Sequence, residues 1–433
     1  MSGQISEKTV LTALSERLRR PVDTGSVTRA RRHLVDWIGC AIAGAAEPAG
    51  EILRQTQTDD PAARAFFWGG LGNILEMDDV DKRALLHPGP SIIPATLAMA
   101  QVIRPDMDTL LKAIVVGYEA TIRLGRAVGP GHYAIWHNTG TCGAIGAATA
   151  CVALLNANEV ETSHAMALAM SQAAGLWQTR HDPGSMGKQL HTAHAARAGL
   201  EAARLAIAGF KGPLDILEGE QGFFKATCPD GDPGGVLATY DADWIIHEVS
   251  FKPWPACRHA HAVIDAALAL RNTMEINDNA PIMIETYSDA LKFCDRAHPT
   301  TVIEAKFSLQ HAVAVALVRG APSLEDFSLA SLADVDLAAV RDRVSVTASD
   351  AFDSVYPARF GAALRVENQH VTIPDALGDP ENPVDDTQLR NKALMLFEAG
   401  GVDAARSTEV INLVLGESDS FEPLDRFLRE VLA

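Results

Sequence analysis

Carboxylates and a histidine gather in one short stretch of the chain, from Glu76 to Gly89. Four carboxylates occur within six residues, two cations follow, and His87 stands between an apolar pair and a Pro-Gly step. A histidine fixed in this way is suited to act as a positioned acid or base. Apolar segments flank the run, and buried carboxylates are costly unless they bind something. The alternative is a solvated loop before a helix that begins at Pro94.

A second group surrounds His137, in the stretch IWHNTGTCG. His137, Asn138 and Thr139 stand at the expected start of a buried helix, where backbone N–H groups favour a carboxylate ligand. The same residues are equally compatible with simple capping of that helix.

Two further groups supply cations. Lys188 opens an Ala-rich helical segment, and a lysine in a dry pocket has a lowered amine pKa and can serve as a base. Lys252 and Arg258 lie in FKPWPACRHAH, where two domains are expected to meet, and could clamp carboxylates. The alternatives are a surface lysine at position 188 and solvated cations on a linker.

Other chemistries are disfavoured by missing motifs. HExxH and GxSxG do not occur, and no cysteine pair supports the histidine pairs His259-x-His261 and His191-x-x-His194 as a zinc site. The six cysteines show no CxxC spacing, which also disfavours an iron–sulfur cluster. We therefore predict no metal and no organic cofactor.

Composition limits the partners. The chain has 433 residues, 47% of them hydrophobic, and a formal net charge of -18. This length predicts two domains, and the charge argues against a nucleic-acid partner. The longest run without charged residues, 127–158, contains Gly, Asn, Thr and His, which indicates core and not a membrane span. The N-terminus lacks a signal-like segment, which together with the scattered cysteines predicts a cytoplasmic protein with reduced thiols.

The element pattern predicts a mostly α fold with a large all-helical domain and a smaller α+β domain. We expect the helical domain to comprise residues 1–250 and 387–433, and the α+β domain residues 251–386. The expected strands are Pro281–Tyr287, Arg343–Ala348 and a hairpin over 363–373, and the C-terminal helices should return to the helical domain. The expected helices are Ser26–Gly44, Pro94–Val102, Met107–Val128, Gly143–Leu155, Glu161–Gly175, Ala195–Gly209, Cys257–Asn272, Thr301–Arg319, Leu337–Val340, Thr387–Ala399 and Ala405–Leu415. Gly143, Gly146, Ala147 and Ala150 should share a face that another helix approaches closely.

Taken in order, these segments resemble the MmgE/PrpD family, which includes 2-methylcitrate dehydratases, cis-aconitate decarboxylases and iminodisuccinate epimerase. The resemblance covers about residues 75 to 317 and rests on LEMDDVDKRALLHPGPSIIPATLAMA, WHNTGTCGAIGAATA, SQAAGL, MGKQLHTAHAARAGLEAARLA, EGEQGFF, FKPWPACRHAH and EAKFSLQHAVAVAL.

The resemblance implies a homodimer with a cofactor-free site in an interdomain cleft, acting on a small polycarboxylate. It implies catalytic roles for His87, His137, Lys188 and Asp79. It implies that substrate is bound by Glu76, Asp78, Lys252, Cys257, Arg258 and Tyr287. The choice among Glu76, Asp78 and Asp79 stays open. The chain departs from the family in having Cys257 where decarboxylases have His, and HPGP where dehydratases have HPSD.

The implied reactions all make or break a C–H bond beside a carboxylate, with cations and hydrogen bonds stabilising the enediolate. The leading expectation is a dehydratase-type lyase, with Lys188 or His137 as base and the other, or His87, as acid. An epimerase of an iminodisuccinate-like acid and a decarboxylase of a cis-aconitate-like acid are the alternatives.

Overall fold

The computed structural model describes residues 8–182, 184–238, 243–272, 280–416 and 418–433. The chain divides into two compact units. Unit 1 comprises Met1–Ile74, Asp78–Val249 and Leu389–Ala433, and unit 2 comprises Leu75–Met77 and Ser250–Gln388. Glu76 and Asp78, two residues apart in the chain, therefore belong to different units.

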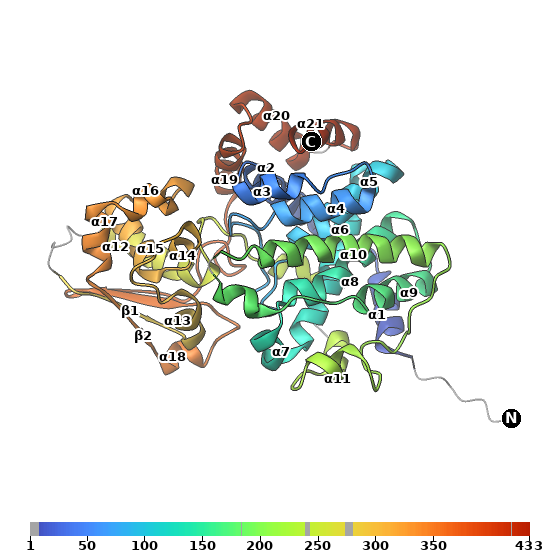
Figure 1. Cartoon of the computed structure of the whole chain (residues 1–433), viewed down its shortest axis with the longest axis horizontal. Coiled ribbons are helices and arrows are strands. Elements are labelled where there is room, and N and C mark those ends of the chain that lie inside the picture. The colour runs from blue at the N-terminus through green and yellow to red at the C-terminus, as the bar shows by residue number, and fades with distance from the viewer. Residues whose placement is uncertain (1–7, 183, 239–242, 273–279, 417) are drawn as a thin grey trace. The chain divides into compact units, whose positions relative to one another are not determined.

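Unit 1 is built from helices (Figure 1). Their bounds are α1 Val10–Leu18, α2 Thr24–Ala45, α3 Pro48–Arg54, α4 Pro61–Leu71, α5 Gly89–Ile103, α6 Met107–Ala127, α7 Gly129–Ile135, α8 Asn138–Leu154, α9 Glu159–Met170, α10 Gly187–Ile207, α11 Phe223–Thr227, α20 Ala404–Leu415 and α21 Glu422–Val431. Short 3-10 turns are Trp177–His181, Pro233–Leu237 and Ile245–Glu248. Polar caps fix several helix starts: Asp23 accepts from the N–H of Ser26, and Asp106 from that of Thr109.

Helix α8 lies at the centre of unit 1 and has no charged residue. Its small residues contact two neighbours, because a Cβ on Gly146 would lie 2.6 Å from the Gly117 carbonyl oxygen of α6, and one on Gly199 of α10 would lie 2.4 Å from Ala147 Cβ. The small residues predicted to share one contact face therefore form two faces, one toward α6 and one toward α10.

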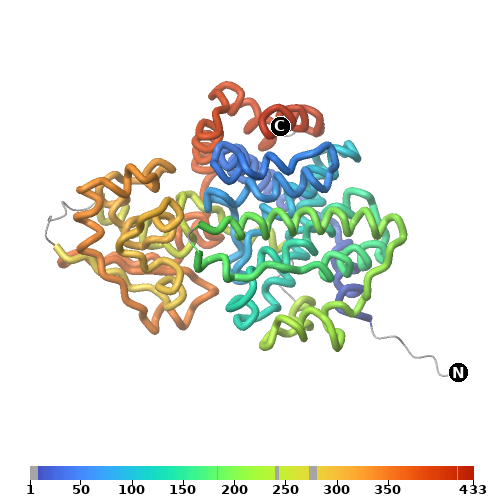
Figure 2. The backbone as a smooth tube through the Cα atoms, viewed as in Figure 1, coloured from blue at the N-terminus to red at the C-terminus, as the bar shows by residue number. Residues whose placement is uncertain are grey.

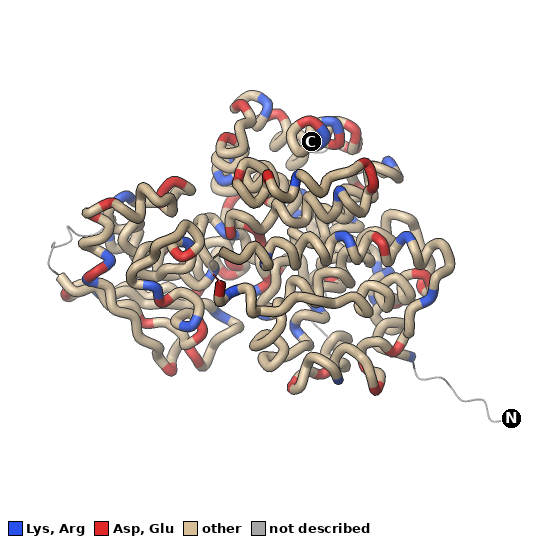
Figure 3. The backbone as a smooth tube through the Cα atoms, in the orientation of Figure 1, with Lys and Arg blue, Asp and Glu red and all other residues tan. Residues whose placement is uncertain are grey.

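The C-terminal helices return to the helical unit, as predicted. Helix α19 (Asp386–Ala399) packs on α2, where a Cβ on Gly39 would lie 3.1 Å from Leu396 Cδ1. Lys392 Nζ lies 2.5 Å from Asp36 Oδ1, and both side chains are buried. Figure 2 shows these red helices beside the blue N-terminal ones, and Figure 3 shows charges of both signs on α20 and α21.

Unit 2 contains a four-stranded sheet in the order β2-β1-β3-β4. The strands are β1 Ile282–Thr286, β2 Val344–Ala348, β3 Ala362–Val366 and β4 Gln369–Ile373. β1 pairs in parallel with β2 and antiparallel with β3, so that Ile284 lies between Val346 and Leu364. The turn Glu367–Asn368 joins β3 to β4. The mixed sheet confirms the predicted smaller α+β part.

Helices α12 and α15 pack on the sheet around a core that includes Val263, Leu309 and Leu364. The helices of unit 2 are α12 His261–Arg271, α13 Ser288–Cys294, α14 Val302–Lys306, α15 Leu309–Val318, α16 Leu329–Leu332, α17 Val335–Arg341 and α18 Asp350–Asp353, with 3-10 turns at Arg258–Ala260 and Leu324–Phe327.

Several predicted helix bounds were wrong. Helix α10 begins at Gly187 and not at Ala195, and α9 ends at Met170 and not at Gly175. The predicted helix Thr301–Arg319 is two helices, because the Ser308 side chain accepts from the N–H of His311 and starts α15 anew. The helix expected from Pro94 begins at Gly89 and carries Pro94 inside it. The helix expected from Gly143 begins at Asn138. Within the described residues, no helix is both long and apolar enough to cross a membrane.

Candidate active site

Asp79 is a fully engaged buried carboxylate in unit 1. Its Oδ2 accepts a hydrogen bond from Tyr118 Oη at 2.7 Å and lies 2.8 Å from His33 Nδ1, while its Oδ1 accepts from the N–H of Gly89 at 2.9 Å. Burial raises the pKa of Asp79 to about 6. A Cβ at Gly89 would lie 2.7 Å from Asp79 Oδ1, so this position of the HPGP segment needs glycine. Asp79 therefore holds the backbone around His87 in place, through its contacts with the N–H of Gly89 and with the His87 ring.

His87 is oriented by two acceptors on one ring nitrogen. Its Nδ1 lies 2.9 Å from Asp78 Oδ2 and 2.9 Å from the carbonyl oxygen of Asp79. Asp78 Oδ2 also accepts from Asn73 Nδ2 at 2.7 Å. Because both groups facing Nδ1 are acceptors, the neutral ring carries its proton on Nδ1 and its lone pair on Nε2. The side chain of His87 is 13% exposed while that of Asp78 is 1% exposed, so the imidazole is the more accessible member of a buried pair. This is the arrangement of a carboxylate-oriented general base.

The start of α8 is tied to the same segment. Thr139 Oγ1 accepts from the N–H of His87 at 3.0 Å, and Asn138 Nδ2 donates to the carbonyl oxygen of Ala84 at 2.8 Å. His137 is the N-cap residue, but its side chain makes no capping hydrogen bond. The alternative that His137 merely caps the helix with its side chain is thus excluded.

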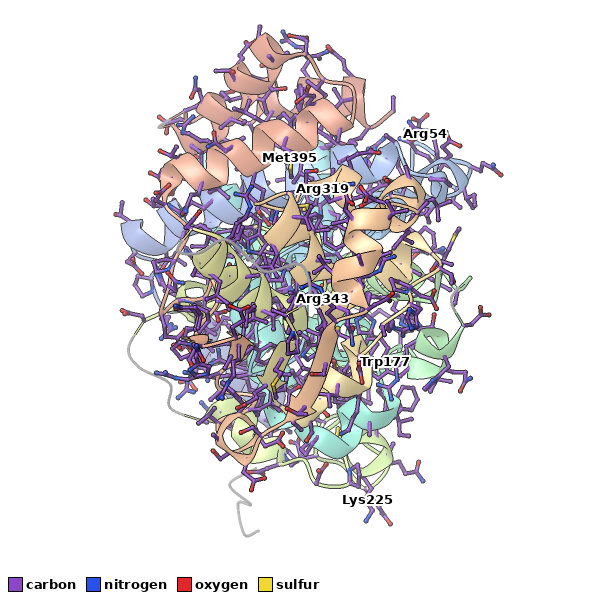
Figure 4. The ribbon with its side chains drawn as sticks, turned by 90° about the vertical axis from the view of Figure 1, so that its left-hand side faces the viewer. Arg54, Trp177, Lys225, Arg319, Arg343 and Met395 are labelled. Carbon is purple, nitrogen blue, oxygen red and sulfur yellow. The ribbon has the colours of Figure 1, made fainter. Side chains whose placement is uncertain are left out.

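His137 is buried and neutral. Burial lowers the pKa of His137 well below its usual value, and the charges of His191, Lys188 and His87 lower it further. Its ring packs on Trp177, labelled in Figure 4, with ring centroids 4.4 Å apart. Lys188 lies in the first turn of α10 and is half-buried. Unit 1 therefore brings His87 and Lys188, both predicted site residues, within electrostatic reach of His137.

In unit 2, Lys252 and Glu76 form a buried pair of a cation and a carboxylate. Lys252 Nζ donates to the carbonyl oxygen of Glu76 at 3.0 Å and lies 3.8 Å from Glu76 Oε2. Lys306 Nζ donates to the carbonyl oxygen of Leu75 at 3.2 Å. Glu76 has a φ of 58°, a left-handed conformation that costs energy for a residue with a side chain. Two lysines thus hold a strained acidic segment in place.

Arg258 is used within unit 2. It pairs with Asp379 Oδ1 at 2.5 Å and donates to the carbonyl oxygens of Leu377 at 3.2 Å and Ala376 at 3.4 Å. Asp379 also accepts from Ser250 at 2.6 Å. Arg258 therefore anchors the chain near residue 379.

Cys257 and Tyr287 are buried beside it. The backbone N–H of Cys257 donates to the carbonyl oxygen of Lys306 at 2.8 Å. Burial and the thiol of Cys257 raise the pKa of Cys294. Tyr287 Oη lies 2.6 Å from His259 Nδ1, and burial raises the pKa of Tyr287 well above its usual value. Tyr287 is thus a neutral hydrogen-bonding group.

Carboxylate oxygens of Asp375, Asp379 and Glu381 lie within 4.8 Å of one another, close enough to share a cation. Asp379 is already neutralised by Arg258, and Arg359 lies 3.2 Å from Asp375 Oδ2. We assign no metal to these residues.

Sequence reasoning missed His33 and Tyr118 as partners of Asp79. Both are buried residues of long helices, α2 and α6, and lie 46 and 39 residues from Asp79 in the chain. The signal available was their position on buried faces, which does not name the partner.

Two protein-family models together match most of the chain. Residues 19–235 match the MmgE/PrpD N-terminal domain, and residues 254–417 match the MmgE/PrpD C-terminal domain. The cis-aconitate decarboxylase of Aspergillus terreus is 25% identical over 435 residues, covering 90% of this chain and 88% of its own length. The human cis-aconitate decarboxylase is 25% identical, covering 70% of this chain and 68% of its own length. The mitochondrial 2-methylcitrate dehydratase of Yarrowia lipolytica is 22% identical, covering 63% of this chain and 57% of its own length. The chain belongs to the MmgE/PrpD family.

Proposed function

We propose that the protein is a lyase that removes a proton from the carbon next to a carboxylate of a small di- or tricarboxylic acid. The observation that carries the proposal is the Asp78–His87 pair, in which the carboxylate orients a partly exposed imidazole and leaves a lone pair on its Nε2. The relatives named above act on cis-aconitate and 2-methylcitrate, both carboxylic acids, which supports the substrate class.

The proposed roles follow from charge and position. His87 is the base, and neutral His137 is the hydrogen-bond donor and acid. Lys188 stabilises the enediolate by its positive charge, for which one well-placed donor is worth about 3–4 kcal/mol. Lys252 binds a substrate carboxylate while Glu76 holds its ammonium group. Asp79 and Arg258 keep the surrounding backbone in position.

Dehydration is the leading form of the reaction, and decarboxylation is the second candidate. The decarboxylase names among the relatives favour the second. Cys257 favours the first, because a thiol exchanges a proton near neutral pH less readily than the imidazole expected at this position in decarboxylases. Epimerisation would use the same groups without loss of water or CO2.

The test is to incubate the purified protein with cis-aconitate, 2-methylcitrate and related hydroxy di- and tricarboxylates in the presence of a chelator. Proton NMR and ultraviolet absorbance of the conjugated double bond follow the products. Loss of water with a new conjugated alkene supports the dehydratase, and release of CO2 supports the decarboxylase. Inversion without either product would sink the lyase, and activity abolished by chelation would sink the cofactor-free mechanism.

A further inference from the structure

A second histidine stands directly behind His137. His191 of α10 places its Nδ1 3.1 Å from His137 Nδ1, with the two ring centroids 5.3 Å apart. His137 is 1% exposed, whereas His191 is only half-buried. The pair therefore connects a buried imidazole to a partly exposed one.

Two glycines make room for this contact. A Cβ on Gly175 would lie 3.2 Å from His191 Cγ and 3.3 Å from its Nδ1, and one on Gly140 would lie 3.1 Å from His191 Cβ. The carbonyl oxygen of Gly175 also accepts from the backbone N–H of His137 at 2.9 Å. Trp177 packs against the His137 ring. The backbone at Gly140 and Gly175 therefore packs on His191, the Trp177 indole packs on His137, and both rings are held in place.

Facing Nδ1 atoms couple the tautomers of the two rings. Between two neutral imidazoles only one Nδ1 can carry the hydrogen, and the ring that donates it has a lone pair on its Nε2. Burial lowers the pKa of His137 well below its usual value and that of His191 to about 4, so both rings are neutral near pH 7. The hydrogen bond between the two rings occupies Nδ1 of each, which leaves both Nε2 atoms for other partners.

We propose that His191 relays protons between solvent and His137, so that the buried imidazole can exchange protons with solvent during the reaction. The proposal rests on the function proposed above. When His137 gives its Nε2 proton to the substrate carbon or leaving group, it takes the hydrogen from His191 Nδ1. His191 then takes a proton from water at its own Nε2. One proton enters from solvent and one leaves to substrate, after which His137 carries its hydrogen on Nδ1 and a lone pair on Nε2. When His137 next accepts a proton at Nε2 in the active site, the reverse sequence returns a proton to solvent and restores the first tautomers.

The activity test compares His191→Phe, which keeps the ring and removes both nitrogens, with His194→Phe one turn further along α10. His194 is a matched control because it lies on the same helix and its Nε2 contacts the carbonyl oxygen of Gln172, at 3.3 Å. We expect His191→Phe to lower kcat about 100-fold with little change in KM, and His194→Phe to leave both unchanged. Added imidazole should restore turnover to His191→Ala, a rescue that a purely structural histidine would not show. Unchanged kcat in His191→Phe, or no rescue of His191→Ala, would overturn the relay.

A second measurement does not need a substrate. In protein labelled with 15N-histidine, the relay predicts that the Nδ1 signals of His137 and His191 are coupled through one shared hydrogen. It also predicts that the His137 signals shift in His191→Phe and stay unchanged in His194→Phe. If the His137 signals are the same in wild type and His191→Phe, the relay is wrong whatever the enzyme acts on. If no acid is turned over but the coupling is present, the proposed function fails and the proton-sharing pair stands.

Discussion

Lys252 Nζ lies 3.0 Å from the carbonyl oxygen of Glu76 and 3.8 Å from its carboxylate, and both side chains are buried. An ammonium group is kept dry in this way only at a considerable desolvation cost, which a bound anion would help to offset. The pair is the clearest sign in unit 2 of a site for a carboxylate.

Replacing Lys252 by Met should weaken substrate binding. We expect KM to rise by about tenfold or more, equivalent to about 1.4 kcal/mol, because the cation that attracts the carboxylate is lost. Lys292→Met removes an exposed lysine of the same unit that pairs with Asp289, and should leave KM unchanged. Steady-state kinetics on both variants decide the point, and equal KM values in Lys252→Met and wild type would refute the role of Lys252.

Replacing Asp78 by Asn should impair His87 as a base. The amide no longer holds the Nδ1 proton of His87 by charge, so the ring loses its fixed tautomer and kcat should fall by about 100-fold or more. Asp59→Asn, on an exposed carboxylate, is the control. The account fails here if Asp78→Asn folds, as judged by circular dichroism, and keeps the wild-type kcat.

Asp79 should make stability depend on pH. Its pKa is raised to about 6 by burial, above the ordinary 3.8 of an unfolded Asp. The folded state therefore binds the extra proton, and this contribution is complete below about pH 4 and is lost as pH rises to about 6.

The matched comparison for Asp79 is Asp79→Asn, which cannot titrate. The advantage of wild type over this variant in free energy of unfolding should shrink by about 2 kcal/mol between pH 4 and pH 6. Urea unfolding at several pH values measures it. A difference that is constant across this window, or that grows with pH, would show that the carboxyl is not desolvated as the structure has it.

The Asp36–Lys392 pair should matter for the attachment of the C-terminal helices to α2. Lys392→Met leaves Asp36 buried without its cation and should cost about 3–5 kcal/mol of stability. The double variant Asp36→Leu/Lys392→Met removes both charges and should recover most of this loss. If the double variant is as unstable as the single one, packing and not the unpaired charge explains the effect.

Local patterns were enough to predict the helical fold and the small sheet. The short, β-rich segments PIMIETY and RVSVTA predicted β1 and β2, and segments rich in Ala, Leu and Val predicted α6 and α8. Caps near helix starts were misjudged, because Ser308 and Pro94 have the same local signals whether a helix begins, continues or restarts there.

The partners within the site were harder to predict. His87 was identified, but the role of Asp78 and the burial of Asp79 depend on contacts with Asn73 and Tyr118 that only folding creates. Arg258 was expected to clamp substrate, whereas its guanidinium pairs with Asp379, more than 100 residues away. The predicted homodimer and the cytoplasmic location stay predictions.

Deuterium transfer tests the central claim most directly. Wild-type protein and His87→Asn are each incubated with the substrate or product acid in D2O, and deuterium on the carbon next to the carboxylate is measured by NMR. The account predicts incorporation by the wild type and a rate at least about 100-fold lower in His87→Asn. Turnover without any exchange at that carbon, or equal rates in the two proteins, would contradict it.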